Sequence, residues 1–366
     1  MRVTFPHMGT LHIPVRAMLA ALGVDVVLAP PSGAETVSIG ARHAPEFACF
    51  PLKLNLGNFV QAHALGADTI LMAGGVGPCR FGYYAQVQRE ILRDLGCQYD
   101  MIVLEPPRGH LAELLHQLRE LVGRRSLAEV WRAVGLAWEK FLALDAVDAA
   151  AMRVRAREAR RGETSRAWRL CLEWIDDAPD RAAVRQARDR GLAALGRVGQ
   201  RDAAAALRVG IVGEVFMVLE PAANLGVAER LGEMGVEVHR SVMLSDWIRT
   251  HLFLDALRLR RGDDPVRRAA RPYLDHFVGG EGRDTVGHTV LYAGAGYDGV
   301  VHVLPFTCMP EIVAKSILPR VTAAHDIPVL SLVLDEHAAE GGVLTRLEAF
   351  VDVLWQRRAA AGVVGR

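Results

Sequence analysis

Apolar and polar positions follow two different periods along the first 108 residues. Short apolar runs bounded by Gly or Pro indicate strands, namely RVTF, VDVVLA, TILMAG and DMIVLEP. Between them, apolar residues recur at helical spacing over roughly 12–22, 54–65 and 80–95. This alternation of strands and helices predicts a mostly parallel sheet that is covered by helices on both faces.

The strand pattern stops from about residue 109 to residue 206, where apolar residues keep helical spacing among Arg, Glu and Ala. It returns from residue 207 with the runs LRVGIVGE, VEVHRSV, GVVHVLP and IPVLSLVLDE. Helical patterns follow at about 221–234, 244–260, 285–295, 309–321 and 343–357. The sequence therefore predicts an α/β protein with two Rossmann-like domains of mostly parallel sheet, residues 1–108 and 207–366, joined by a helical segment, residues 109–206.

Composition narrows the class of function only a little. The 366 residues carry a formal net charge of +1, so bulk charge favours neither a nucleic acid nor a membrane surface as partner. The first residues lack the apolar core of a signal peptide, and Glu214 and Glu220 interrupt the apolar run VGIVGEVFMVLEP before it could span a bilayer. We expect a soluble, cytoplasmic protein. The Arg-rich helical segment is interpreted as solvated surface rather than as an anion site.

Three of the five cysteines lie in loops ahead of predicted helices. Cys79 follows TILMAG within GGVGPCRFGYY, Cys308 follows GVVHVLP, and Cys49 lies just upstream of the second predicted helix. Loops that follow parallel strands emerge at the carboxyl edge of the sheet, and a helix N-terminus stabilises a thiolate. The three thiolates can therefore converge across an interdomain cleft and bind a metal cluster, with Gly75 and Gly77 letting the backbone approach it.

Two alternatives remain for these cysteines. In the first, each loop cysteine is a small apolar residue packed in the interior, which is the role that we assign to Cys97 and Cys171. A zinc site is the other alternative, although structural zinc prefers closely paired ligands and the chain has no CxxC pair. Three thiolates would leave one iron of a [4Fe–4S] cube without a thiolate, and a histidine such as His43 or His302 is a candidate fourth ligand.

Charged residues near the carboxyl edges are further candidates. Lys53, Lys315 and Arg80 lie close in sequence to the loop cysteines, and they could ease reduction of a cluster, contact a CoA phosphate or be ordinary surface charge. Glu336 and His337 follow the last predicted strand and form a candidate acid/base pair, with helix capping as the alternative.

Six segments resemble the 2-hydroxyacyl-CoA dehydratase superfamily. They are PHMGTLHIP, ACFPLKLNLGNF, GGVGPCRFGYY, LEPAANLGVAERLGEMGVEVHRS, PFTCMPEIVAKSILPRV and LDEHAAEGGVLTRLEAFVD, and the similarity is most specific around Cys308. The chain is most similar to the activase-related branch, whose members are described as CoA-substrate-specific enzyme activase-like. Longer relatives carry an ATP-binding activase domain ahead of this region, so the chain resembles a stand-alone form.

The resemblance implies a [4Fe–4S] cluster held by Cys49, Cys79 and Cys308. In dehydratase subunits of the superfamily, a separate ATP-dependent iron–sulfur activase supplies one electron, and a radical elimination of water from a 2-hydroxyacyl-CoA follows. Related members with a double-cubane cluster reduce small molecules instead. The chain has no GxxxxGK[ST] loop, so we expect its electrons to come from such an activase or another reductase. A homo- or hetero-dimer could bring two sets of ligands together.

Three functions are compatible with these residues. The chain could be a component of an iron–sulfur radical dehydratase or reductase that acts on an acyl-CoA or a small molecule. It could instead be a non-catalytic electron-transfer or cluster-holding protein that serves a partner enzyme, or a metal-free α/β protein that binds a small ligand. Bound iron separates the third function from the first two, and a response of the cluster to substrate separates the first from the second.

Overall fold

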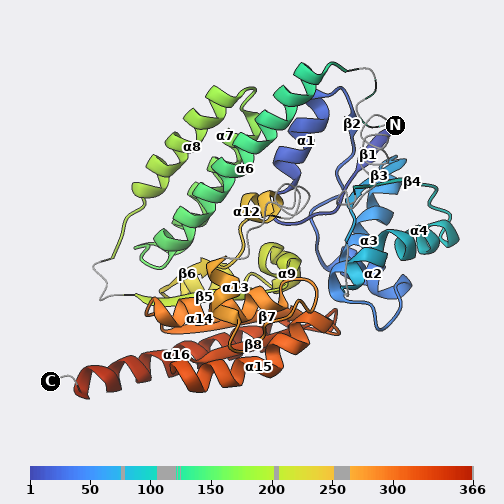
Figure 1. Cartoon of the computed structure of the whole chain (residues 1–366). Helices are drawn as coiled ribbons and strands as arrows, with labels where there is room; N and C mark the ends of the chain where they lie inside the picture. Colours follow the sequence, from blue (N-terminus) through green and yellow to red (C-terminus); the bar gives the residue numbers. More distant parts are fainter. Residues whose placement is uncertain are drawn as a thin grey trace. The chain divides into compact units, whose positions relative to one another are not determined.

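The computed structural model describes residues 1–75, 79–104, 121, 123, 125–201, 206–250 and 264–364 (Figure 1). Contacts divide the chain into two compact units: unit 1 is Met1–Ala143, Asp176–Arg185 and Leu244–Arg260, and unit 2 is Leu144–Ile175, Gln186–Met243 and Arg261–Arg366. The domain boundaries expected at residues 108 and 206 fall in or beside segments outside the described residues. They stay predictions.

Unit 1 contains a four-stranded, all-parallel sheet in the order β2-β1-β3-β4. Its strands are β1 (Arg2–Thr4), β2 (Asp25–Val26), β3 (Thr69–Ala73) and β4 (Asp100–Leu104). Each lies within an apolar run of the sequence. The first four residues of β3 are buried, because this inner strand is covered on both faces.

The helices of unit 1 confirm the three expected ones and add a fourth. They are α1 (His12–Ala21), α2 (Ala34–His43), α3 (Phe50–Ala64) and α4 (Tyr84–Asp94), with a short 3-10 helix η1 (Arg80–Tyr83) ahead of α4. The unexpected helix is α2, which packs closely on α3. A Cβ atom on Gly40 would lie 1.8 Å from the carbonyl oxygen of Lys53, and one on Gly57 would lie 2.1 Å from that of Thr36.

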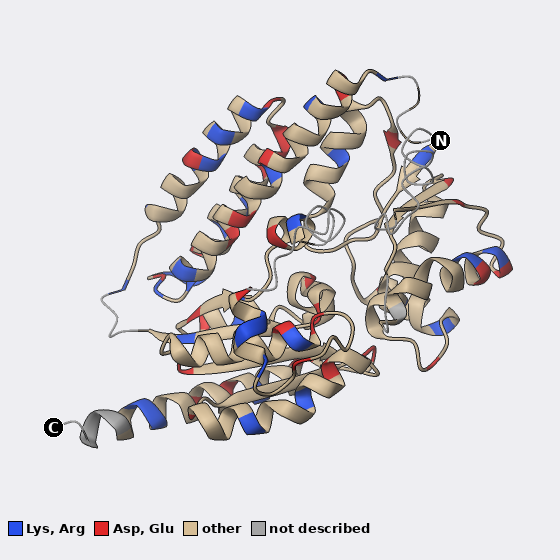
Figure 2. Ribbon diagram, viewed as in Figure 1, with Lys and Arg blue, Asp and Glu red and all other residues tan. Residues whose placement is uncertain are grey.

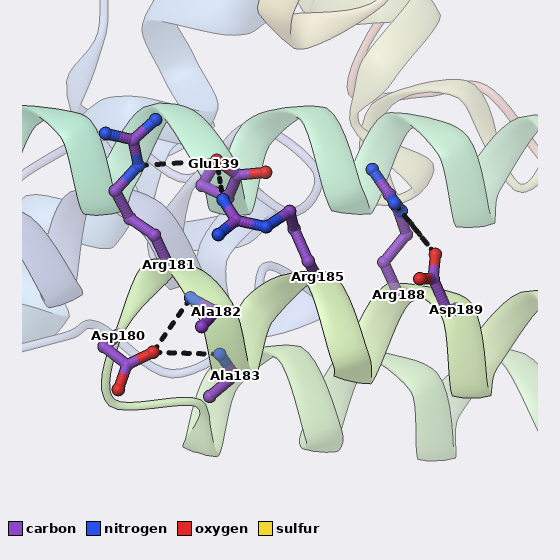
Figure 3. Close-up of polar contacts among 8 residues, drawn as sticks. All are labelled: Glu139, Asp180, Arg181, Ala182, Ala183, Arg185, Arg188 and Asp189. Carbon is purple, nitrogen blue, oxygen red and sulfur yellow. Dashed lines mark hydrogen bonds and ion pairs between the residues drawn. The ribbon is translucent and has the colours of Figure 1, made fainter.

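The described part of residues 109–206 is helical, as expected, apart from an isolated bridge between Glu158 and Gln200. Its long helices are α6 (Leu127–Arg155), α7 (Glu163–Asp177) and α8 (Arg181–Gly196). Basic and acidic residues are mixed along them (Figure 2). Arg181 and Arg185 of α8 both bind Glu139 of α6, at 3.4 and 3.1 Å (Figure 3). These arginines belong to a solvated, paired surface.

Unit 2 contains a second four-stranded, all-parallel sheet, in the order β6-β5-β7-β8. Its strands are β5 (Leu207–Gly213), β6 (Val236–Arg240), β7 (Gly299–Pro305) and β8 (Val329–Leu334). All four coincide with expected runs, and every residue of β7 is buried. Two parallel sheets of this kind confirm the expected α/β class with Rossmann-like organisation.

Helices follow the strands of the second sheet. They are α9 (Val215–Leu219), α10 (Pro221–Asn224), α11 (Val227–Glu233), α12 (Leu244–Ile248), α13 (Pro265–Ala270), α14 (Gly282–Gly294), α15 (Met309–His325) and α16 (Glu340–Val364). Of these, α12 is grouped with unit 1. Helix α14 packs against β5 and β7, and α15 packs against β7 and β8. No helix in the described ranges has the length and apolarity needed to cross a membrane.

Both sheets share one strand order, and this order positions the candidate sites. In each sheet the first strand pairs with the second on one side and with the third on the other, so the direction in which strands are added to the sheet reverses between the first and third strands. Ligands of doubly wound sheets bind at the carboxyl ends of such a pair. In unit 1 that pair is β1 and β3, and in unit 2 it is β5 and β7.

Candidate functional site

Each of the three loop cysteines stands immediately before a helix. Cys49 is the N-cap of α3, Cys79 is the N-cap of η1, and Cys308 is the N-cap of α15. All three have extended backbone, with ψ angles of 153°, 132° and 104°. A helix N-terminus presents backbone N–H groups and the positive end of its dipole, which favour a thiolate over a thiol. The expected local setting of the three cysteines is therefore present.

The loop of Cys49 lies against the segment that follows Cys79. The Tyr84 hydroxyl and the Cys49 thiol share a hydrogen bond, and the Tyr84 ring packs edge-on against Phe81, with ring centroids 5.3 Å apart. Cys49 and Phe81 also border the same apolar cluster of unit 1, of which Tyr84 is a member. The sequence analysis missed Tyr84. Its signal was the aromatic run FGYY, which begins two residues after the loop cysteine.

The glycines next to Cys79 have a structural use in the loop itself. A Cβ atom on Gly75 would lie 2.7 Å from a ring carbon of Phe81 and 3.1 Å from the backbone nitrogen of Gly82. The Gly74 N–H donates to the carbonyl of Leu104 at 2.9 Å, which extends the pairing of β3 with β4. Close packing of the loop thus accounts for Gly75, and its expected contact with a cluster stays a prediction.

Two of the expected cofactor contacts, Gly77 and the side chain of Arg80, lie outside the described residues. The two lysines of the set differ from each other. Lys53 is only 3% exposed, and its ammonium group donates to the carbonyl of Glu46 at 3.1 Å, in the loop just before Cys49. Lys315 is exposed on α15. Lys53 is therefore not ordinary surface charge, and a contact of either lysine with a cofactor stays a prediction.

The expected acid/base pair lies at the end of β8, with its two members close together. Nε2 of His337 is 3.9 Å from Oε1 of Glu336, and the His337 side chain is 85% exposed. The His337 backbone N–H donates to Asp335 at 2.9 Å, which closes the turn before α16. The exposed imidazole is well solvated, and a role in proton transfer stays a prediction.

A buried polar cluster in unit 2 was missed by the sequence analysis. His302 of β7 and Glu311 of α15 are both fully buried, and Nε2 of His302 is 2.9 Å from Oε2 of Glu311. Thr285 of α14 donates to the same carboxylate oxygen at 3.0 Å. The other ring nitrogen of His302 lies 3.2 Å from the hydroxyl of Ser331 on β8. Both nitrogens of His302 are therefore occupied, which disfavours it as a fourth metal ligand.

Glu214 stands at the carboxyl end of β5, beside β7. Its backbone N–H donates to Val303 at 3.2 Å, and its carboxylate accepts from the N–H groups of Phe216 and Met217 at 3.2 and 3.0 Å. Burial raises the pKa of Glu214 to about 7, and the charge of Glu311 adds to this rise, although the two backbone donors lower it. Glu214 and Cys308 thus follow β5 and β7, the two strands between which the strand order of the second sheet reverses.

The remaining cysteines are packing residues, as expected. Cys97 is a member of the apolar cluster of unit 1, and Cys171 is fully buried in α7, where a Cβ atom on Gly191 would lie 3.0 Å from its sulfur. Burial raises the pKa of both thiols. All five cysteines are described, and none forms a disulfide.

The described residues contain no ready-made group of three or more His, Cys, Asp or Glu side chains that could hold a metal ion. Cys49 and Cys79 belong to unit 1, whereas Cys308 belongs to unit 2. The convergence of the three on one cluster therefore stays a prediction.

Comparison with known families gives one match. The model of the CoA enzyme activase uncharacterised domain (DUF2229) matches residues 7–244, which is more than half of the chain. The matched region includes Cys49, Cys79 and Glu214 and ends before β7 and Cys308. No curated protein matches the chain.

Proposed function

Because the chain belongs to the family of the CoA enzyme activase uncharacterised domain, within the activase- and dehydratase-related superfamily, we propose that it is an iron–sulfur protein of the 2-hydroxyacyl-CoA dehydratase type. Cys49, Cys79 and Cys308 bind its [4Fe–4S] cluster. One observation carries the proposal: all three loop thiols, and neither of the other two, are N-cap residues of helices.

The donor set fits such a cluster. Thiolates are the usual protein ligands of a cube, and N-cap positions favour the thiolate form. The Tyr84 hydroxyl lies in hydrogen-bonding contact with the sulfur of Cys49, and hydrogen bonds to ligand sulfurs raise a cluster's reduction potential. Cys97 and Cys171 do not fit, because burial holds both as neutral thiols.

A bound cube would supply one-electron chemistry at low potential. The family description names a CoA enzyme activase, which supports an acyl-CoA substrate and a partner enzyme for this chain. We infer that electrons come from a separate reductase, and that the reaction is dehydration of a 2-hydroxyacyl-CoA or reduction of a small molecule. The alternative is a carrier that passes electrons to a partner without binding a substrate.

Anaerobic reconstitution with iron and sulfide tests the cluster. We expect about four irons per chain, and Ser in place of Cys49, Cys79 or Cys308 should each remove most of the iron and the visible absorption. Cys97→Ala and Cys171→Ala are matched controls and should keep both. Far-UV circular dichroism of the apoproteins checks that each variant folds. Wild-type protein without iron, or equal iron loss in the controls, would overturn the proposal.

The electron paramagnetic resonance spectrum of the reduced protein separates an enzyme from a carrier. A dehydratase or reductase component should show a changed spectrum when a 2-hydroxyacyl-CoA is added, because substrate approaches the iron that lacks a thiolate. Coenzyme A without the acyl group is the control. An unchanged spectrum with a panel of acyl-CoA compounds would instead support the carrier.

A further inference from the structure

We propose that helix α6 carries the interface of a homodimer, in which the α6 helices of two copies of this chain pack antiparallel about a two-fold axis. The contact is made by an apolar surface stripe on α6, which consists of Leu127, Trp131, Trp138 and Leu142. The stripe lies on unit 1, contains no cysteine and needs no bound iron. The proposal is therefore independent of the proposed cluster.

The four side chains of the stripe lie on one face of the helix. At 3.6 residues per turn, positions 127, 131, 138 and 142 fall within about 60° of one another around the helix axis. Leu127 is 80% exposed, Trp131 is 73% exposed and Leu142 is 41% exposed, and Trp138 is partly exposed. Single exposed apolar residues are common on protein surfaces, whereas a row of large ones is typical of a protein–protein contact.

Other faces of α6 make their contacts within the chain. Ala137 and Phe141 are buried. Glu139 pairs with two arginines of α8 (Figure 3), and Nζ of Lys140 donates to the carbonyl of Asp176 in α7 at 2.7 Å. These charged residues thus serve the packing of α6 on its own neighbours, while the large apolar side chains of the stripe stay in contact with solvent. This distribution is unfavourable for a single chain and favours a partner that covers the stripe.

The stripe is self-complementary, which identifies the partner as a second copy of this chain. Its residues read Leu, Trp, Trp, Leu with spacings of four, seven and four positions, so the order is the same from either end. In an antiparallel pair centred between positions 134 and 135, Leu127 meets the partner's Leu142 and Trp131 meets the partner's Trp138. A two-fold axis makes each of these contacts twice, which is the arrangement of an isologous interface.

The size of the stripe sets the expected affinity. Burial of an aromatic side chain removes about 150–250 Å² from solvent, so two tryptophans and two leucines that are partly exposed contribute on the order of 400 Å² per copy. The total of roughly 800 Å² for the two copies is less than the roughly 1,200–2,000 Å² of a standard stable interface. We therefore expect a reversible dimer with a Kd on the order of micromolar.

Sedimentation velocity of the full chain tests the surface. Between about 1 and 100 μM, the average mass should rise from that of one chain towards that of two. Trp131→Ala should raise the Kd at least about 100-fold, because tryptophan is a typical hot-spot residue and each dimer loses two of them. Trp355→Ala is the matched control and should leave the Kd unchanged, since Trp355 is an exposed tryptophan of a different helix, α16.

Disulfide cross-linking tests the antiparallel register. In the proposed pair, residue 127 of one copy lies beside residue 142 of the other, whereas the two copies of residue 127 lie about 22 Å apart at 1.5 Å per residue. A mixture of Leu127→Cys and Leu142→Cys chains should therefore form a covalent dimer on oxidation. Either variant alone should form no more of it than the oxidised wild type, which measures cross-linking by the five native cysteines.

Several results would overturn the proposal. One is a wild-type chain that stays monomeric over the whole concentration range, which would leave a different protein as the occupant of the stripe. Equal effects of Trp131→Ala and Trp355→Ala would also do so, as would efficient cross-linking of Leu127→Cys with itself. Far-UV circular dichroism checks that each variant folds. If Trp131→Ala does not fold, the mixed cross-linking decides, and its absence overturns the proposal.

Discussion

Replacing Gly213 with Ala should destabilise unit 2 more than any helix glycine replacement. Gly213 ends β5 with a φ of +138°, a backbone conformation that L-residues with a side chain rarely adopt. Its Cβ would meet the backbone of β7, at 1.8 Å from the carbonyl oxygen of Val303 and 2.8 Å from the carbonyl carbon. Real Cβ atoms essentially never approach closer than 3.0 Å, so the two strands must separate by about 1.2 Å.

The size of the loss follows from two contributions. A residue forced into a rarely populated φ/ψ region costs about 1–3 kcal/mol. Separation of the strands also removes the hydrogen bond from Glu214 N–H to Val303, which contributes about 0.5–1.5 kcal/mol. We therefore expect a loss of roughly 2–4 kcal/mol in the free energy of unfolding, a large share of a domain's total stability.

Urea unfolding, together with hydrogen exchange of the β5 and β7 amides, measures this loss. Gly342→Ala is the matched control, because Gly342 lies exposed in α16 and a Cβ atom added there would have open space around it to 4 Å. The control should gain up to about 1 kcal/mol from helix propensity. A loss below about 1 kcal/mol for Gly213→Ala, or equal effects of the two replacements, would refute the steric reasoning.

Three further predictions concern buried charges. Asp148→Asn should cost about 2–4 kcal/mol in urea unfolding, because it removes the negative charge 2.7 Å from Arg240, whose side chain is only 11% exposed. Asp246→Asn removes an exposed pair and should change stability by under about 1 kcal/mol. Glu158→Gln should lower stability at pH 7, and the deficit should shrink as the pH falls from the ordinary carboxyl pKa through the lowered pKa of Glu158; a deficit that grows in acid would contradict the lowered pKa. Glu214 binds its proton more tightly in the folded state, so wild-type stability should fall as the pH rises from 4.5 to about 7, by up to about 3 kcal/mol, and thermal unfolding of Glu214→Gln should lack this slope.

The strands could be predicted from sequence because each is a short, β-branched apolar run with turn residues on both sides. Helix α2 could not, because its contact with α3 depends on close approach at Gly40 and Gly57 rather than on an apolar stripe. Helix prediction from spacing depends on large apolar side chains at regular positions. A helix contact made through glycines leaves no such pattern in the sequence. Most of the expected helix over 244–260 lies outside the described residues, and its described part includes α12.

The candidate site could likewise be predicted only in part from the sequence. The N-cap positions of Cys49, Cys79 and Cys308 follow from local order, because a strand, a loop and a proline or aromatic run specify where the next helix begins. The contact between His302 and Glu311 joins a strand and a helix whose packing no local pattern encodes. A signal was present nonetheless: a histidine inside the fully apolar run GVVHVLP requires a buried polar partner.

The strand order of the second sheet has a consequence for synthesis on the ribosome. Val209 of β5 pairs with Gly299 of β7, 90 residues later, whereas Leu207 pairs with Val236 of β6, only 29 residues later. Gly299 follows Val236 by 63 residues, so at roughly 5–20 residues per second β5 and β6 can join about 3–13 s before β7 has been made. During that interval the second edge of β5 is an apolar, unpaired template for other nascent chains, so chaperone binding to this stretch should matter more for yield than the stability of the finished fold.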